Sequence, residues 1–383
     1  MTGTPNSERL HIVLAGERNS GKSSLLNALT GQRAAIVSDV PGTTTDSVSK
    51  AMEIRGLGPC VLVDTAGLDD AGRLGRSRVD GAQEALRAGD VVLAVIDAST
   101  GRLPSLPHTD SPVIPVINKS DVADTDALTA EAEAVFGRKP VKVSALQCKG
   151  IEELIAAISE AIPENWASPL LTEGLVKEGD LVVLVMPQDV QAPKGRLILP
   201  QQQTLRELLD RKCRAVCCTT DLLRQTLEKL GETPAAIIAD SQALAEAGRL
   251  KSDRTRLTSF SMLLAASKGD IDYFRKSART IDSLTSKSRV LIAEACTHVP
   301  ASEDIGRVKI PRLLRSKAGE GLAVDVVSGR DFPADLRGYD LVIHCGACMF
   351  NRRYVLSRVE QAKRQGVPMT NYGIAIAYIN NLL

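Results

Sequence analysis

The chain has 383 residues, which is too long for one ordinary hydrophobic core and predicts two or three domains. Its 47 basic and 46 acidic residues give a formal charge of +1, so the overall charge does not favour a polyanion or an anionic membrane as main partner. Only 3% of the residues are aromatic, which disfavours a stacking surface for nucleic acid.

The sequence also leads to an expectation about the protein's location. No apolar run is long enough to span a membrane, and the first nine residues lack the apolar core of a signal peptide. We therefore expect a cytoplasmic protein that makes no membrane contact. In that reducing compartment, the eight cysteines are expected to be thiols or metal ligands rather than disulfides.

The first part of the chain predicts a parallel sheet covered by helices. From Leu10 to about Pro163, short β-branched runs such as "HIVLAG" and "VVLAVIDAS" alternate with helical stretches such as "KSSLLNALTG". The segment "PENWASP" then interrupts the pattern with two prolines and reads as a linker. A first α/β domain is thus expected over residues 1–168.

Two further α/β domains are expected, over residues 169–262 and 263–383. In the first of them, "DLVVLVMP", "AVCCTT" and "AAIIAD" predict strands, and helices are expected over residues 204–213 and 221–231. A polar helical segment follows over 261–284. In the last domain, strands are predicted at "RVLIAEACTH", "LAVDVVSG", "YDLVIHCG" and "PMTNYG", and helices over 310–319 and 350–366.

A phosphate-binding loop is predicted at the end of the first strand. The stretch "GERNSGKS" at Gly16 to Ser23 fits the pattern G-x-x-x-x-G-K-[ST] between an apolar strand and an amphipathic helix. Its backbone N–H groups would cradle phosphates, Lys22 would reach the β and γ phosphates, and the Ser23 hydroxyl would bind Mg²⁺. Further nucleotide contacts are expected from Gly16, Asn19, Ser20, Gly21 and Ser24.

Four more motifs follow along the chain in the order expected of a GTPase. In "DTAG", Asp64 can hold Mg²⁺ through water and the Gly67 amide can meet the γ phosphate. In "NKSD", at Asn118, Lys119, Ser120 and Asp121, the Asp121 carboxylate can accept from guanine groups that adenine does not offer, so GTP is favoured over ATP. The "SAL" stretch, with Ser144 and Ala145, lies where an amide could meet the guanine carbonyl, and "PGTTTD" supplies the switch threonines Thr43 and Thr44.

Over about the first 165 residues, these motifs resemble the translation-factor-like GTPases. Asn19, followed by "PGTTTD", is similar to the potassium-activated GTPases of the tRNA-modifying and ribosome-assembly type. The resemblance implies that Asn19 and carbonyls near Ser38 and Val40 bind K⁺, that Thr44 binds Mg²⁺, and that Lys22, Asn19, Thr44 and Gly67 act in catalysis. Leu68 replaces the glutamine that orients water in Ras, so hydrolysis should be slow and cation-assisted. The alternative role for Asn19 is a hydrogen bond that braces the loop.

Two short stretches near the C-terminus hold three cysteines and two histidines. Cys296 and His298 follow the apolar run "RVLIAEA", and 45 residues separate His298 from His344, Cys345 and Cys348 at the end of "YDLVI". If both runs are parallel strands of one sheet, both sets emerge at the same carboxyl edge. The next helix could then stabilise thiolates through its N-terminal N–H groups.

The chemistry of these residues leaves several readings open. A redox C-x-x-C pair would leave Cys296 and both histidines without a role, whereas structural Zn²⁺ and an iron-sulfur cluster both suit the ligand types. The other five cysteines are expected to be ordinary thiols in or beside apolar runs: Cys60, Cys148, Cys213, Cys217 and Cys218.

The pattern C-x-H, then H-C-x-x-C, after a potassium-type GTPase domain resembles the GTPase maturation protein of iron-only (FeFe) hydrogenase across essentially the whole chain. The resemblance implies a 4Fe-4S cluster on Cys296, Cys345 and Cys348, with His298 and His344 as exchangeable ligands or outer-shell donors. It also implies a homodimer formed by the middle domain. The protein would carry a transient diiron precursor from two radical maturation enzymes to the apo-hydrogenase.

The main rival is a potassium-activated GTPase that acts on RNA or ribosomes and carries a C-terminal structural Zn²⁺ module. Neutral charge and scarce aromatic residues disfavour this rival.

Overall fold

The computed structural model describes residues 4–31, 48–65, 73–164, 166–186, 197–295, 304–329 and 331–383. The chain divides into two compact units, Met1–Ala167 and Ser168–Leu383. The division after Ala167 lies one residue from the linker boundary expected from "PENWASP". The boundary expected between residues 262 and 263 falls inside helix α8 (Phe260–Lys268). Within the described ranges, no helix has the length and apolarity needed to cross a membrane.

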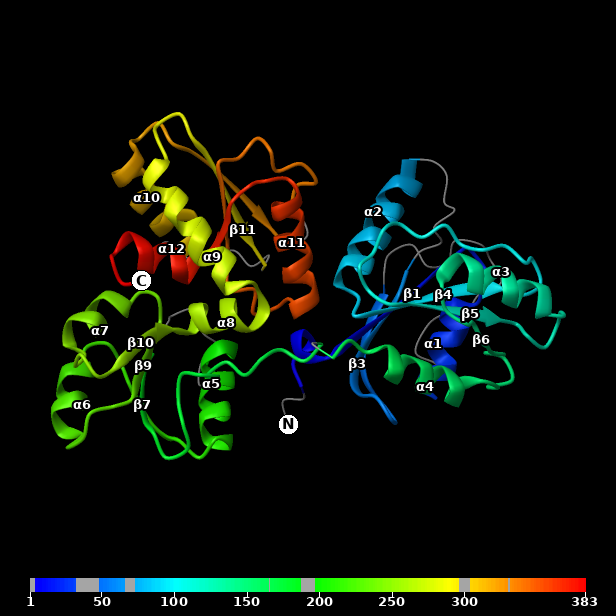
Figure 1. The fold of residues 1–383 in the computed structure, drawn as a ribbon, viewed down its shortest axis with the longest axis horizontal. Helices are drawn as coiled ribbons and strands as arrows, with labels where there is room; N and C mark the ends of the chain where they lie inside the picture. Colours follow the sequence, from blue (N-terminus) through cyan, green and yellow to red (C-terminus); the bar gives the residue numbers. More distant parts are fainter. Residues whose placement is uncertain are drawn as a thin grey trace. The chain divides into compact units, whose positions relative to one another are not determined.

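The first unit contains a six-stranded sheet in the order β2-β3-β1-β4-β5-β6 (Figure 1). All neighbours pair in parallel except β2 and β3, which are antiparallel. The predicted parallel sheet is therefore confirmed, and β2 is an additional edge strand that the sequence analysis did not identify. The strands are β1 (Leu10–Gly16), β2 (Val48–Ile54), β3 (Gly58–Asp64), β4 (Val91–Asp97), β5 (Val113–Asn118) and β6 (Val141–Lys142).

Helices cover both faces of this sheet. Helices α1 (Lys22–Thr30) and α4 (Ile151–Ala161) pack on the face that carries Leu10, Ile12 and Leu14 of β1. On the opposite face, α2 (Arg73–Ala88) packs near Val13 and Ala15, and α3 (Asp126–Phe136) packs against β4 and β5. Because strands buried on both faces need apolar residues at consecutive positions, β1 and β4 read as continuous apolar runs. Polar residues occur instead at the carboxyl ends of the strands, as at Asp64, Asp97 and Asn118.

The second unit contains two four-stranded parallel sheets (Figure 1). The first has the order β10-β9-β7-β8, with β7 (Leu181–Val185), β8 (Arg214–Cys218), β9 (Ala236–Ala239) and β10 (Arg256–Ser259). The second has the order β12-β11-β13-β14, with β11 (Arg289–Glu294), β12 (Ala323–Ser328), β13 (Leu341–His344) and β14 (Met369–Asn371). The α/β character expected for both later segments is confirmed.

Several helices differ from the sequence expectation. Helix α5 spans Leu199–Asp210 instead of 204–213, because Pro200 occupies its first turn, where no backbone N–H is needed, and the chain turns at Lys212 with φ 55°. The segment 261–284 is broken after α8, at Gly269. Asp270 then caps α9 (Ile271–Ala278) by accepting a hydrogen bond from the Tyr273 N–H, and a 3₁₀ turn follows over Arg279–Ser283.

The remaining helices of this unit are α6 (Leu223–Lys229), α7 (Leu244–Leu250), α10 (Ile310–Ala318), α11 (Arg352–Arg364) and α12 (Tyr372–Ile379). Helices α6, α10 and α11 lie where they were expected, and a π-helical turn over Ile305–Lys309 leads into α10.

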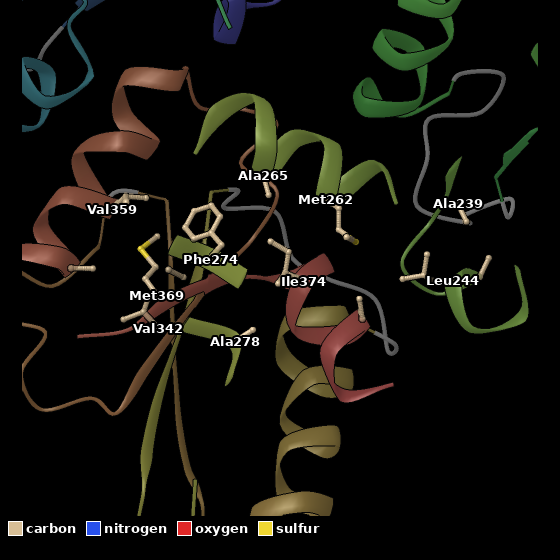
Figure 2. Packing of buried hydrophobic residues seen from close by; sticks show 14 of the residues in the cluster. Ala239, Leu244, Met262, Ala265, Phe274, Ala278, Val342, Val359, Met369 and Ile374 are labelled. Atoms are coloured by element: carbon tan, nitrogen blue, oxygen red, sulfur yellow. The ribbon is translucent and has the colours of Figure 1, made fainter. Parts of the chain in front are cut away.

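One apolar cluster runs through both sheets of the second unit. It joins Val183 of β7 and Leu291 of β11 through side chains of the intervening helices. Figure 2 shows Met262 and Ala265 of α8 in this cluster with Phe274 of α9 and Ile374 of α12. Helix α8 therefore packs with elements of both sheets, which makes the second unit a single packed body.

Candidate nucleotide site and cysteine loop

The phosphate-binding loop connects β1 to α1, as its motif predicts. Asn19 and Gly21 have left-handed backbone angles, with φ 59° and 86°. A Cβ at Gly16 would lie 2.4 Å from the Val95 carbonyl oxygen, and one at Gly21 would lie 2.2 Å from the Asn118 Nδ2. Gly16 is thus required by the close approach of the Val95 backbone, and Gly21 by its left-handed conformation and the nearby Asn118 side chain. The Asn19 side chain is exposed.

Lys22 points its ammonium group into this loop. The side chain is 7% exposed, and Nζ donates to the carbonyl oxygens of Gly16 at 3.1 Å and Glu17 at 2.7 Å. These contacts hold a positive charge at the N-terminus of α1, where Ser24 follows in the first turn. The arrangement suits a phosphate, because the helix N-terminus and the ammonium both attract negative charge.

Ser23, in the first turn of α1, and Asp64, at the carboxyl end of β3, come together. The Ser23 Oγ donates to Asp64 Oδ2 at 2.5 Å. Asp64 Oδ1 and Ser20 Oγ are buried and have no hydrogen-bond partner among the described residues. Burial raises the pKa of Asp64, while the Ser23 hydrogen bond and the Lys22 charge oppose the rise. Buried oxygen ligands of this kind fit Mg²⁺, because binding the ion would offset the free-energy cost of removing them from water.

Asn118 links the phosphate-binding loop to the "SAL" stretch. Its Nδ2 donates to the Ser20 carbonyl oxygen at 2.9 Å, and its Oδ1 accepts from the Ala145 N–H at 3.1 Å. One amide of the stretch expected to meet the guanine carbonyl, that of Ala145, is therefore bonded to Asn118 in this structure. Ser144 is buried, and its Oγ accepts from the Gln147 N–H at 3.2 Å.

Lys119 and Asp121 of "NKSD" lie at the surface side of the same edge. The Lys119 ammonium forms an ion pair with Asp97 Oδ2 at 2.6 Å. Burial would raise the pKa of Asp97, but hydrogen bonds from Lys119 and Ser99 hold it below its usual range. Asp121 is exposed and accessible to a base. Asp97 was not identified from the sequence; the only signal was its position at the end of a buried strand.

Several predicted contacts fall outside the described residues. They are the switch and γ-phosphate positions Ser38, Val40, Thr43, Thr44, Gly67 and Leu68, and the cysteine-site residues Cys296 and His298. Their assigned roles stay predictions.

In the second unit, the strands that precede the predicted metal ligands are neighbours. β11 and β13 pair in parallel, with Ala293 opposite His344, and the Cys345 N–H donates to the Ala293 carbonyl oxygen at 2.9 Å. The expected common edge for the two strands is confirmed. Cys345 and Cys348 lie on the turn before α11, in a segment that we call the cysteine loop, residues 345–350.

Two backbone amides point at the Cys345 sulfur. The Ala295 N–H donates to Cys345 Sγ at 3.0 Å, and the Ala347 N–H donates at 3.4 Å. Burial raises the pKa of the Cys345 thiol to about 11, and these two amides oppose the rise. Ala347 reaches this geometry through a left-handed backbone, with φ 51°. Within the described ranges, no three His, Cys, Asp or Glu side chains form a metal-binding group.

His344 lies behind the cysteine loop. It is buried, its Nδ1 lies 2.8 Å from the Cys345 carbonyl oxygen, and its Nε2 lies 3.0 Å from Arg358 Nη1. Since a guanidinium can only donate, Nε2 is the acceptor and Nδ1 carries the proton. Burial, with the Arg358 charge, lowers the pKa of His344 to about 3. Both ring nitrogens are engaged, so the geometry favours an outer-shell role over direct ligation.

Arg358 and Lys268 are two buried cations beside the loop that the sequence analysis missed. The Arg358 guanidinium lies 4.7 Å from the Phe332 ring, 4.8 Å from the Phe350 ring and 4.6 Å from the Tyr354 ring. It also donates to the Gly329 carbonyl oxygen at 2.7 Å. Neither residue belongs to a sequence motif. Lys268 contacts the loop, and Arg358 contacts His344, from a different element of the fold.

Comparison with known families gives three matches along the chain. Residues 11–119 match a 50S ribosome-binding GTPase model, residues 171–269 match the Hydrogen maturase F dimerization domain, and residues 272–383 match the Hydrogen maturase F tetramerization domain. The last two models belong to one family and together cover more than half of the chain. The chain belongs to the hydrogen maturase F family. The GTPase architecture and the family expected from the motifs are confirmed.

Curated relatives match the GTPase domain of this hydrogen maturase F chain. The tRNA modification GTPase MnmE of Moorella thermoacetica is 39% identical over 165 residues, 41% of this chain and 36% of that protein. The MnmE of Synechococcus sp. (strain JA-3-3Ab) is 38% identical over 175 residues, 43% of this chain and 36% of that protein. The chain thus spans little more than a third of the length of these relatives.

Solved GTPase structures are similar to the maturase chain at low TM-scores. A crystal structure of Era in complex with MgGDPNP and nucleotides 1506-1542 of 16S ribosomal RNA is 22% identical, covers 66% of this chain and 93% of that chain, and has a TM-score of 0.39. The FeoB G-domain from Methanococcus jannaschii is 28% identical, covers 40% of this chain and 98% of that chain, and has a TM-score of 0.32.

Proposed function

We propose that this chain hydrolyses GTP and holds an iron-sulfur cluster that serves in assembly of the diiron unit of FeFe-hydrogenase. The observation that carries the cluster half is the pair of backbone N–H groups that donate to Cys345 Sγ. One of them belongs to Ala295, and Cys296 is the next residue in the chain. The N–H groups stabilise a thiolate, which is the ligand form that iron requires.

The ligands for the cluster are Cys296, Cys345 and Cys348. A cluster bound by three thiolates supplies an iron with a coordination position that a second metal unit can occupy. His344 supports the site from behind, because its Nδ1–H bonds the Cys345 carbonyl oxygen. His298 remains the candidate for the exchangeable position. The cargo in this proposal is the diiron precursor, delivered from two radical maturation enzymes to the apo-hydrogenase by a cytoplasmic homodimer.

The nucleotide half of the proposal rests on the phosphate-binding loop. Lys22 would neutralise the β and γ phosphates, and Ser23 with Asp64 would hold Mg²⁺, with Thr44 as a further ligand. Asp121, which is exposed, would select guanine. K⁺ bound near Asn19 would supply the positive charge that an arginine provides in other GTPases. The exposed side chain of Asn19 supports this role over a hydrogen bond that braces the loop.

The cluster is tested by anaerobic reconstitution followed by iron, sulfide and zinc analysis and electron paramagnetic resonance of the reduced protein. The unsubstituted chain should bind about four irons and four sulfides. Cys345→Ser should lose most of this iron, because a thiolate ligand is removed. Cys217→Ser, which changes an exposed cysteine on another sheet, should retain it. Stoichiometric Zn²⁺ without a cluster signal would support the rival RNA-associated GTPase with a zinc module.

Potassium activation is tested by measuring GTP hydrolysis in equal concentrations of KCl and NaCl. We expect hydrolysis to be at least about tenfold faster in KCl. The bound K⁺ would take the place of an arginine side chain, and in GTPases that use such an arginine it accelerates hydrolysis by far more than tenfold. Asn19→Ala should remove the difference between the two salts. Equal rates for the unsubstituted chain would contradict the potassium site.

A further inference from the structure

Helix α8 lies directly against the cysteine loop although the two belong to different family domains. The helix follows β10 and is capped by Ser259, whose Oγ accepts from the Met262 N–H. It falls within residues 171–269, which match the dimerization domain, whereas the cysteine loop falls within 272–383, which match the tetramerization domain. Any contact between them therefore links the two domains at the proposed cluster site.

Lys268, the last residue of α8, makes the strongest of these contacts. Its side chain is only 4% exposed, and Nζ donates to the carbonyl oxygens of Ala347 at 3.1 Å, Cys348 at 3.4 Å and Phe350 at 2.7 Å. An ammonium has three donors, so these three carbonyls can replace the water it loses on burial. A buried lysine that spans one short loop fixes the path of that loop.

A second contact joins the start of α8 to the other end of the loop. The Ser261 Oγ donates to Asn371 Oδ1 at 3.0 Å, and Asn371 Nδ2 donates to the Cys345 carbonyl oxygen at 3.2 Å. Between these ends, a Cβ at Gly346 would lie 3.5 Å from Leu264 Cδ1. Ser261, Leu264 and Lys268 are spaced at i, i+3 and i+7, so one face of α8 supports the whole loop.

Other residues of α8 make apolar contacts. Met262 and Ala265 pack in the cluster that joins both sheets of the second unit (Figure 2). The dense packing of such a core lets it transmit small displacements instead of absorbing them. A shift of α8 relative to the second sheet therefore moves the carbonyls that Lys268 holds.

We propose that Lys268 is a positioning residue for the cluster: it fixes the spacing of Cys345 and Cys348 from the dimerization domain and places a positive charge against the backbone of their loop. The inference rests on the proposed function of these cysteines as cluster ligands. It makes the ligand geometry dependent on α8, so that a rearrangement in the dimerization domain changes the affinity and the reduction potential of the cluster.

The test uses the full chain with Lys268→Met, Lys268→Arg and, as matched control, Lys276→Met on the exposed surface of α9. The first readout is amide hydrogen exchange of residues 344–352 in the metal-free chain. Loss of a charge-assisted hydrogen-bond network should speed exchange by about tenfold or more in Lys268→Met. Lys268→Arg keeps the charge but not the geometry and should fall between, and Lys276→Met should match the unsubstituted chain.

The second readout is the reconstituted cluster, measured by its rate of iron loss to a chelator and by its reduction potential. Lys268→Met should lose iron about tenfold faster and show a lower potential, because a nearby positive charge stabilises the reduced, more negative cluster. Melting curves and elution volumes of the metal-free variants show whether each one folds, and Ser261→Ala, which weakens the other contact, provides a milder second test.

The outcomes separate the two proposals. If the unsubstituted chain binds a cluster but Lys268→Met shows unchanged exchange, iron loss and potential, the inference about Lys268 is wrong. If the unsubstituted chain binds no cluster, the proposed function fails, and the exchange measurement alone decides whether Lys268 holds the loop.

Discussion

Asn118 contributes to the nucleotide site as a structural link rather than only as a base contact. Its side-chain amide joins the Ser20 carbonyl oxygen to the Ala145 N–H, and it is 2% exposed. The motif therefore has two kinds of residue. Asn118 holds two loops together, while Asp121 is exposed and accessible to guanine.

We expect Asn118→Ala to destabilise the nucleotide-free GTPase domain by about 2–4 kcal/mol, because it leaves buried backbone groups of two loops without partners. Thermal or denaturant unfolding measures the loss. Asp121→Ala is the control: it should weaken GTP binding by more than about tenfold with little change in unfolding, since its carboxylate is exposed. Equal unfolding of Asn118→Ala and the unsubstituted chain would show that the link carries no stability.

At the scale of elements, the chain breaks between α8 and α9, and this break makes Lys268 the last residue of α8. Gly269 lies so close to Phe274 that an added Cβ would be 2.4 Å from Phe274 Cε2 and 3.1 Å from the Ala265 carbonyl oxygen. The periodicity of residues 261–284 favours one continuous helix, but the steric limit at Gly269 and the Asp270 cap divide it.

Gly269→Ala should therefore destabilise the second unit by about 1–3 kcal/mol through overpacking against a buried aromatic ring. The control is Gly338→Ala, where the nearest atom to an added Cβ is Arg289 Nη1 at 3.9 Å, and where little change is expected. Denaturant unfolding of both variants provides the comparison. A Gly269→Ala variant as stable as the control would mean that Phe274 moves aside without cost.

At the scale of the whole molecule, the family match includes dimerization and tetramerization domains. Strand β8 lies at the edge of its described sheet and pairs only with β7 there. An edge strand offers backbone groups to which a second copy can add. The exposed Cys217 lies on this strand and marks the surface that a homodimer through β8 would cover.

We expect Cys217→Lys to weaken self-association by roughly tenfold or more, because a charge on an edge strand opposes pairing with another strand. Light scattering over a concentration series measures the mass relative to the 40.9 kDa chain. Cys148→Lys, at an exposed cysteine of the first unit, is the matched control and should leave the mass unchanged. A Cys217→Lys chain with unaltered mass would exclude β8 as the contact.

The sequence determined the parts whose chemistry is local. The phosphate-binding loop, "NKSD" and the parallel sheet of the first unit follow from short patterns in which neighbouring residues act together. The cysteine pattern predicted that two distant stretches meet, and the parallel pairing of β11 with β13 bears this out for the strands. Local patterns suffice there because the carboxyl ends of parallel strands always share an edge.

Only the tertiary structure decided which polar residues serve these sites from other elements. Asp97, Lys268 and Arg358 belong to no motif, and their roles come from contacts across 14 to 82 positions in the chain. The Arg358 contact engages Nε2 of His344 and the neighbouring Cys345 carbonyl oxygen engages Nδ1, although the motif position of His344 had offered it as a ligand. A buried cation is stable only where folding brings acceptors or aromatic rings around it. For Arg358 the Phe350 and Tyr354 rings are close in the sequence, but the acceptors of Lys268 are all distant, so the sequence around Lys268 gives no sign of its burial.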